Sequence, residues 1–247
     1  MTTSQELKDL IRVLGLKKEE VVVDGEPSGR MLRHEFDVSP EEFLLQAERD
    51  FEAGGNSRRL NSLTNSKRAI EAQVDEIVFG IGYDPRTIAV KRKWELLKEI
   101  GFVTPRILMR VNDTRNKLEH GYESPSEAEV EDALDLATLF IECGGRGVGS
   151  LSLGNLKECR QGNPEFRFEN ELSVEFIDNG FRVWAFKSTP NALFGQVANR
   201  REYLVGELLI RPDVPIYKDL LRLGVAVDRE IKEKIDLAVR KLFDSIG

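Results

Sequence analysis

The sequence predicts an α+β protein in which a helical bundle is followed by a smaller α+β module with an antiparallel hairpin. Apolar residues recur at helical spacing in several capped segments between residues 39 and 145. After Gly145 the pattern changes to alternating runs, two of which flank the turn-forming pair Asn179-Gly180. We therefore expect an N-terminal helix and hairpin over residues 1–37, a helical bundle over 38–145 and an α+β module over 146–247.

The N-terminal segment predicts one short helix and one hairpin. Leucines and an isoleucine share one side of residues 4–14, and Gly15 ends that helix. Short strands at 20–24 and 31–36 flank a turn rich in glycine and proline. Because an isolated hairpin is rarely stable, these strands must pack on either the bundle or the module, and the sequence leaves both open. Alternation with polar neighbours marks His34 as a surface residue of the second strand.

The helical region carries start and stop signals at nearly every element. Ser39 supplies a cap, Pro40 suits the first turn, and Glu42 completes a capping box three residues later. The same pattern returns at Ser124-Pro125-Ser126-Glu127. The predicted helices run from residue 40 to Gly54, from about 56 to 81, over 88–100, over 105–120, and from the capping pattern at 124–127 to the glycine pair at 144–145.

The C-terminal region predicts strands joined by short turns. Residues 172–177 and 181–186 alternate on either side of the Asn-Gly turn, and 203–210 is a third strand. Residues 145–150 are glycine-rich and read as a linker. One helix, starting at Asp228 and carrying Ile231, Ile235, Leu242 and Phe243, closes the chain.

Composition limits the function classes. The chain has 247 residues, 40% of them hydrophobic, which suffices for a proper core. We expect a cytoplasmic protein without a membrane partner, because no apolar run is long enough to span a bilayer and the N-terminus lacks signal-peptide character. The two cysteines, Cys143 and Cys159, are not in a C-x-x-C spacing, so neither a disulfide framework nor a zinc site is indicated. No nucleotide-binding or zinc-protease motif occurs, and we expect no cofactor and no metal.

Charge is distributed unevenly along the bundle. The net charge of −7 argues against a protein that simply coats nucleic acid. Residues 56–119 nevertheless hold thirteen basic and eight acidic side chains, whereas residues 121–143 hold seven acidic and no basic ones. These segments are either two solvated helix faces of opposite sign or a partner-binding surface.

The most informative stretch is the predicted helix over 105–120, which holds the better placed of the chain's two histidines. Arg115 falls in its aliphatic stripe, whereas Asn116 and His120 lie four residues apart on the other side. An arginine in an apolar stripe costs free energy unless it is paired or has a task. One interpretation is that Arg115 pairs with Glu119 and that His120 is an ordinary helix-end histidine. The other interpretation is that Arg115 and His120 both belong to a functional site.

Arg115, Asn116 and His120, with a helix break at the histidine and a capped helix following, resemble the R-x(4–6)-H motif of HEPN domains. The resemblance covers roughly residues 39–145. It implies an α-helical bundle that dimerises with the motif helices of two subunits facing each other. It also implies metal-independent endoribonuclease activity of the toxin or phage-defence kind, with His120 as acid and base, Arg115 on the phosphate, and Asn116 in support.

Further expectations follow from this resemblance. We expect the basic residues Arg110, Lys117, Lys67 and Arg68 to bind RNA. Residues 146–247 contain no histidine, so they should select substrate or partner rather than carry the chemistry. Other HEPN proteins have lost catalysis, and the alternative is therefore a silent scaffold that binds RNA, a nucleotide, or a protein such as an antitoxin.

Overall fold

The computed structural model describes residues 3–24, 37–102, 124–147, 152–158, 170–177, 180–187 and 203–246. Within these residues helices and an antiparallel sheet occur together, which confirms the α+β class. The helices are α1 (Thr3–Leu14), α2 (Pro40–Ala53), α3 (Asn56–Gly80), the 3-10 turn η1 (Pro85–Thr87), α4 (Val90–Glu99), α6 (Glu127–Gly147), α7 (Tyr217–Asp228) and α8 (Lys232–Ile246). The strands are β1 (Val21–Asp24), β2 (Ser152–Glu158), β3 (Glu171–Ile177), β4 (Gly180–Phe186) and β5 (Leu204–Ile210).

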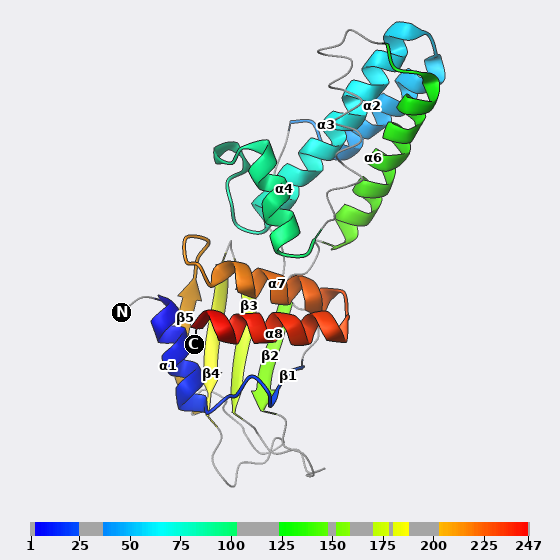
Figure 1. The fold of residues 1–247 in the computed structure, drawn as a ribbon. Coiled ribbons are helices and arrows are strands. Elements are labelled where there is room, and N and C mark those ends of the chain that lie inside the picture. Colours follow the sequence, from blue (N-terminus) through cyan, green and yellow to red (C-terminus); the bar gives the residue numbers. More distant parts are fainter. Residues whose placement is uncertain are drawn as a thin grey trace.

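Helices α2, α3, α4 and α6 form an elongated bundle beside the module that contains the sheet (Figure 1). The capping box predicted for α2 is present, because the Glu42 N–H donates to Ser39 Oγ at 3.2 Å and the Glu42 carboxylate accepts from the Ser39 N–H at 2.8 Å. An ion pair between Arg59 and Glu127 holds the first turns of α3 and α6 together. The two helices therefore run in the same direction, with Leu63, Ile70, Val130 and Ala137 in their shared core.

The sheet has the strand order β1-β2-β3-β4-β5, and every neighbouring pair is antiparallel. The hairpin predicted around Asn179-Gly180 is confirmed by the pairing of β3 with β4, in which Ile177 lies opposite Gly180. The predicted third strand corresponds to β5. The predicted first strand is β1, which pairs with β2 and so brings the N-terminal segment to the module. The predicted strand at 31–36 lies outside the described residues.

Helices α1, α7 and α8 lie over one face of the sheet (Figure 1). Alternate strand residues point into this layer, among them Leu172, Val174, Phe181 and Val183, each at most 2% exposed. The strand period of two explains the alternation, because successive side chains point to opposite faces. The module's core is therefore one face of the sheet together with the helices that cover it.

Two predicted boundaries were wrong. Helix α6 continues to Gly147, through the glycine pair where an end was predicted, which shortens the predicted linker. The C-terminal helix predicted from Asp228 is in fact two helices, because α7 ends at Asp228 and α8 begins at Lys232. Helix α7 gives a weak sequence signal, since Ile216 at its N-terminus offers no side-chain cap and its residues are buried on nearly all sides.

Helix α7 joins the module to the bundle. The Tyr217 hydroxyl donates to the carbonyl of Ile81, at the end of α3, over 2.7 Å. Arg222 donates to the carbonyl of Glu99 at 3.0 Å, and Arg229 donates to the carbonyls of Gly101 and Phe102. The two arginines thus satisfy the free carbonyls at the end of α4, where a positive charge is favoured by the helix dipole. A single buried cluster of side chains runs from α3 and α4 into the sheet.

Two tyrosines at this junction should respond differently to loss of their hydroxyl groups. Tyr83 and Tyr217 pack edge to face at 5.8 Å, but the buried Tyr83 hydroxyl has no hydrogen-bond partner among the described residues. Burial raises the pKa of Tyr83 to about 12, so its hydroxyl stays neutral. We expect Tyr217→Phe to lower the free energy of unfolding by about 1–3 kcal/mol, because the Ile81 carbonyl loses its buried donor. Tyr83→Phe, the matched control, should leave it unchanged or raise it. Urea unfolding measures both, and equal losses in the two variants would contradict this assignment.

Candidate functional site

Most of the predicted site residues lie outside the part of the chain that the structure describes. These are Arg110, Arg115, Asn116, Lys117 and His120, together with the predicted helix over 105–120. Two of the predicted RNA-binding residues, Lys67 and Arg68, are described and lie in the middle of α3. The candidate site can therefore be approached through these two side chains and through the described residues on either side of the motif segment, residues 103–123.

Lys67 and Arg68 point in different directions because successive helix residues are turned by about 100°. The Lys67 side chain is only 14% exposed, and its ammonium lies 3.2 Å from the Glu71 carboxylate one turn further on. Arg68 is exposed and has no ion-pair partner among the described residues. Lys67 lies on the same side of α3 as Val74 and Val78, which belong to the buried cluster that includes Phe102. Lys67 is therefore on the side of α3 that leads toward the start of the motif segment.

The residue before the motif segment is firmly held. Phe102 is 9% exposed and belongs to the buried cluster between bundle and module. Its carbonyl accepts from Arg229, whose guanidinium also lies 5.6 Å from the centre of the Phe102 ring. Lys218 donates to the Glu99 carboxylate at 2.9 Å, and this hydrogen bond, aided by one from Arg92, lowers the pKa of Glu99. The chain thus enters the motif segment from a fixed point on α7.

The residues after the motif segment are held at the opposite end of the bundle. Pro125 is buried, and α6 begins with a capping box formed by Ser126 and Glu129. The box lies two residues later than the predicted pair Ser124 and Glu127, because Glu127 instead forms the ion pair with α3. The two flanks of the motif segment are therefore separated by most of the length of α3.

A buried carboxylate fixes α2 against α3. Asp50 is 2% exposed and accepts hydrogen bonds from Arg58 at 2.7 Å, from Gln46 at 3.1 Å and from Asn65 at 3.3 Å. Hydrogen bonds from Arg58, and next from Gln46, lower the pKa of Asp50. The charge-assisted bond to Arg58 is the strongest of the three, so Asp50 acts as a structural anion in the α2–α3 hairpin.

Helix α3 also buries polar groups that find no partner. The hydroxyls of Ser62 and Ser66 and the side-chain carbonyl of Gln73 have no hydrogen-bond partner among the described residues. All three side chains fall on one narrow strip of the helix. Serine keeps this strip narrow enough for close packing, at the cost of desolvated hydroxyls.

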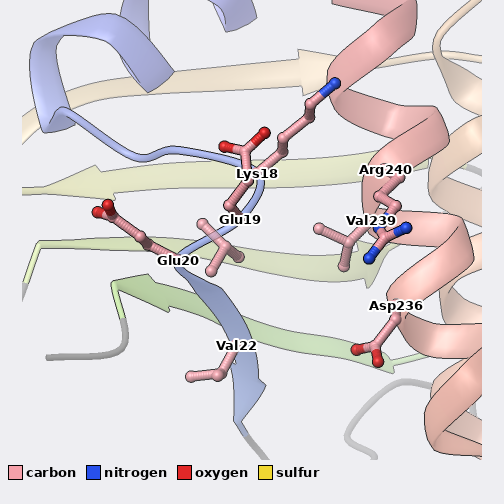
Figure 2. Close-up of a pocket in the computed structure, with 8 residues that line it drawn as sticks. Lys18, Glu19, Glu20, Val22, Asp236, Val239 and Arg240 are labelled. Carbon is pink, nitrogen blue, oxygen red and sulfur yellow. The ribbon is translucent and has the colours of Figure 1, made fainter. Parts of the chain in front are cut away.

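A pocket of about 520 Å³ lies far from the bundle, between β1 and α8 (Figure 2). It is lined by Lys18, Glu19, Glu20, Val21, Val22, Asp236, Val239 and Arg240. Two basic residues, Lys18 and Arg240, line the pocket. The Lys18 ammonium lies 3.0 Å from the Asp244 carboxylate, and Arg240 is on α8. The carboxylates of Glu19 and Glu20, next to β1, and of Asp236, on α8, offset this positive charge. The pocket therefore favours neither an anion nor a cation. None of the predicted site residues lines it.

Among the described residues, no cluster of histidine, cysteine or carboxylate side chains suits a metal ion. No helix in the same residues has the length and apolar character needed to cross a bilayer. Comparison of the chain with protein-family models, curated proteins and solved structures found no match. The HEPN resemblance therefore stays a prediction carried by Arg115, Asn116 and His120.

The sequence did not predict the residues that fix α2 against α3 and the end of α4 against the module, namely Asp50, Arg222 and Arg229. Asp50 lies on the buried side of α2, where a carboxylate is unusual, and that placement was the one available signal. Arg222 and Arg229 gave none, since an arginine on a helix is normally solvated and their acceptors lie more than 120 residues away in sequence.

The lowered pKa of Asp50 should make the protein less stable in acid. A carboxyl group whose folded pKa is depressed contributes stability above its unfolded value, near 3.8, and loses it as the pH falls through the folded pKa. We expect Asp50→Asn to reduce stability at neutral pH and to flatten the loss of stability below about pH 5. Glu52→Gln, an exposed carboxylate of the same helix, is the control. The midpoint of urea unfolding, measured across pH, tests this. If the midpoint of Asp50→Asn falls with acid as steeply as that of the wild type, the role given to Asp50 is contradicted.

Proposed function

We propose that the protein is an HEPN-type endoribonuclease that cleaves RNA without a metal, at a site shared by two copies of the chain. The observation that carries this proposal is the motif Arg115-Asn116…His120 in the connection between α4 and α6 of a helical bundle. The described flanks of that connection, Phe102 and Ser124, support it. They lie at opposite ends of the bundle, and a helix over 105–120 would rise about 24 Å between them.

The chemistry suits these residue types. Attack of a ribose 2′-OH on the neighbouring phosphate requires a group that takes its proton, a group that protonates the leaving 5′-oxygen, and a cation near the phosphorane. Histidine titrates near neutral pH and can fill the first two roles, whereas arginine grips phosphate in a bidentate manner. In this scheme His120 moves the protons, Arg115 holds the phosphate, and Asn116 is the polar group that supports them.

A shared site follows from helix geometry. Arg115 and His120 are five residues apart, so on a regular helix they point roughly 140° away from each other. Two copies related by a two-fold axis would bring the arginine of one subunit near the histidine of the other, and would supply two histidines to one site. The exposed Arg68 of α3 would add positive charge for RNA, whereas Lys67 is mostly buried and engaged by Glu71.

One observation favours the alternative of a silent scaffold. The outer face of α6 exposes Glu131, Asp132, Asp135 and Glu142, and this concentration of negative charge repels RNA. A basic protein partner, such as an antitoxin, fits such a face better. Cleavage and binding assays distinguish the two functions.

Two substitutions in the motif should have different effects. We expect His120→Ala to slow RNA cleavage in EDTA by about 10²–10⁴-fold with nearly unchanged RNA affinity, because it removes only proton transfer. Arg115→Ala should reduce both turnover and RNA affinity. The slope of log affinity against log salt concentration should become smaller by about 1, because one phosphate contact is lost.

The controls for this pair are His34→Ala, which alters the other histidine, and Arg86→Ala, which removes an exposed arginine paired with Asp84. Both should behave as wild type. Cleavage that persists at full rate in His120→Ala would mean that the activity comes from another site. Absence of cleavage by the wild type, with RNA or partner binding retained, would favour the scaffold.

A further inference from the structure

Strand β5 is an edge strand of the sheet that the described residues form. It is the last strand of the sheet and pairs with β4, and no other described strand pairs with it. It is seven residues long, whereas β1, at the other edge, has four. Natural edge strands are commonly shortened or carry lysine or proline, which prevent pairing with another chain. The sequence of β5, Leu-Val-Gly-Glu-Leu-Leu-Ile, contains neither.

Exposed aliphatic side chains lie on both sides of Glu207 in β5. Gly206 faces the helical layer, where Leu10 of α1 approaches so closely that a Cβ atom at Gly206 would lie 2.4 Å from Leu10 Cδ2. Glu207 and Leu209 therefore face the opposite side, on which Leu209 is 44% exposed. The pairing of β4 with β5 shifts register at Val205, which is 43% exposed, because Gly206 pairs with Ala185 and Leu204 with Phe186. Val205 and Leu209 are each two residues from Glu207 along the strand.

We propose that β5 pairs antiparallel with β5 of a second copy, about a two-fold axis that passes through Glu207, so that the two five-stranded sheets become continuous. In this register Val205 lies opposite Leu209 of the partner subunit on both sides of the axis. Axes through Gly206 or Leu208 would instead bring Glu207 opposite an aliphatic side chain. The strand is therefore complementary to itself in one register.

The two Glu207 carboxylates would meet at the axis, and like charges directly opposite each other oppose pairing. Each has its own counter-charge, because Arg182 on β4 lies 3.5 Å from Glu207 in the same subunit. The Arg182 guanidinium is also held 5.6 Å from the centre of the Trp184 ring, next to Glu207 in the β4–β5 register. The axis would carry two adjacent carboxylates flanked by two guanidinium groups, with a net charge of zero.

The interface is separate from the dimer proposed for ribonuclease activity, which uses the bundle, and it does not rest on that function. A chain with only the β5 interface forms a dimer, whereas a chain with two self-complementary interfaces whose two-fold axes cross at right angles forms a tetramer. Blocking β5 halves the mass in both cases. No assay of this interface involves RNA, so its failure and the failure of the ribonuclease proposal are distinguishable.

The first test is the mass of the full chain by sedimentation at micromolar concentration, for wild type, Val205→Glu and Val22→Glu. Val22 is the matched control, because it lies at the other edge of the sheet and is also 43% exposed. It faces Lys157 across the strands, so a carboxylate there is tolerated in the monomer. We expect Val205→Glu to have half the wild-type mass with an unchanged circular dichroism spectrum, and Val22→Glu to match the wild type. A monomeric wild type, or a Val205→Glu variant of unchanged mass, overturns the proposal.

The second test fixes the register and does not depend on tolerance of a charge. Residues directly opposite in an antiparallel pair have Cα atoms about 4.5–5.5 Å apart, within the range of a disulfide. Glu207→Cys should therefore form a covalent dimer under mild oxidation. Val205→Cys is the control, since the two copies of that residue would lie about 13 Å apart, and both variants retain Cys143 and Cys159. No covalent dimer in Glu207→Cys, or as much of it in Val205→Cys, overturns the proposed pairing.

Discussion

The end of α4 is capped by arginines from a helix that follows it by more than 100 residues, and the arrangement of the two halves depends on this contact. A helix leaves its last carbonyl groups without intrahelical donors, and burying them unsatisfied costs free energy. Arg222 of α7 and Arg229, which directly follows that helix, donate to the carbonyls of Glu99, Gly101 and Phe102, while Tyr217 donates to Ile81 at the end of α3. Two helix ends of the bundle thus terminate on one helix of the module.

This constraint links the module to the proposed chemistry. Phe102 is the last described residue before the segment that carries Arg115 and His120, and its carbonyl and ring both contact Arg229. A change in the packing of α7 on the sheet would be felt at this point, because packed interiors transmit displacement. The module need not contribute a catalytic group to influence the motif, in keeping with its lack of histidine.

Local signals predicted much of the fold. The Ser39 capping box and the Asn-Gly hairpin each depend on residues close in sequence, and both were found where expected. Helix α7 was missed because Ile216, before its first residue, offers no capping side chain. The glycines at 144–145 did not end α6, since a glycine's cost of about 1 kcal/mol in a helix is easily outweighed by packing.

The candidate site was less predictable than the fold, because it depends on long-range contacts. Lys67 looked like a free cation in the sequence, yet its side chain is mostly buried and engaged by Glu71. The hydroxyls of Ser62 and Ser66, which have no partner among the described residues, are likewise buried by long-range packing that no local pattern encodes. What the sequence contributes is the motif itself, and what the structure adds is the pair of fixed ends from which that segment starts and finishes.

The most direct test of the claim that bundle and module form one unit uses the chain's two tryptophans. Trp94 on α4 packs 6.1 Å from Phe140 of α6, and Trp184 lies on β4, so each reports on one half. Urea unfolding is followed by fluorescence in Trp184→Phe, which retains Trp94, and in Trp94→Phe, which retains Trp184, with circular dichroism recorded on the same samples. If the α7 contacts couple the halves, the fluorescence and dichroism transitions coincide within each variant. A fluorescence transition that is separate from the dichroism transition in either variant would show that the halves unfold independently, and would contradict the account.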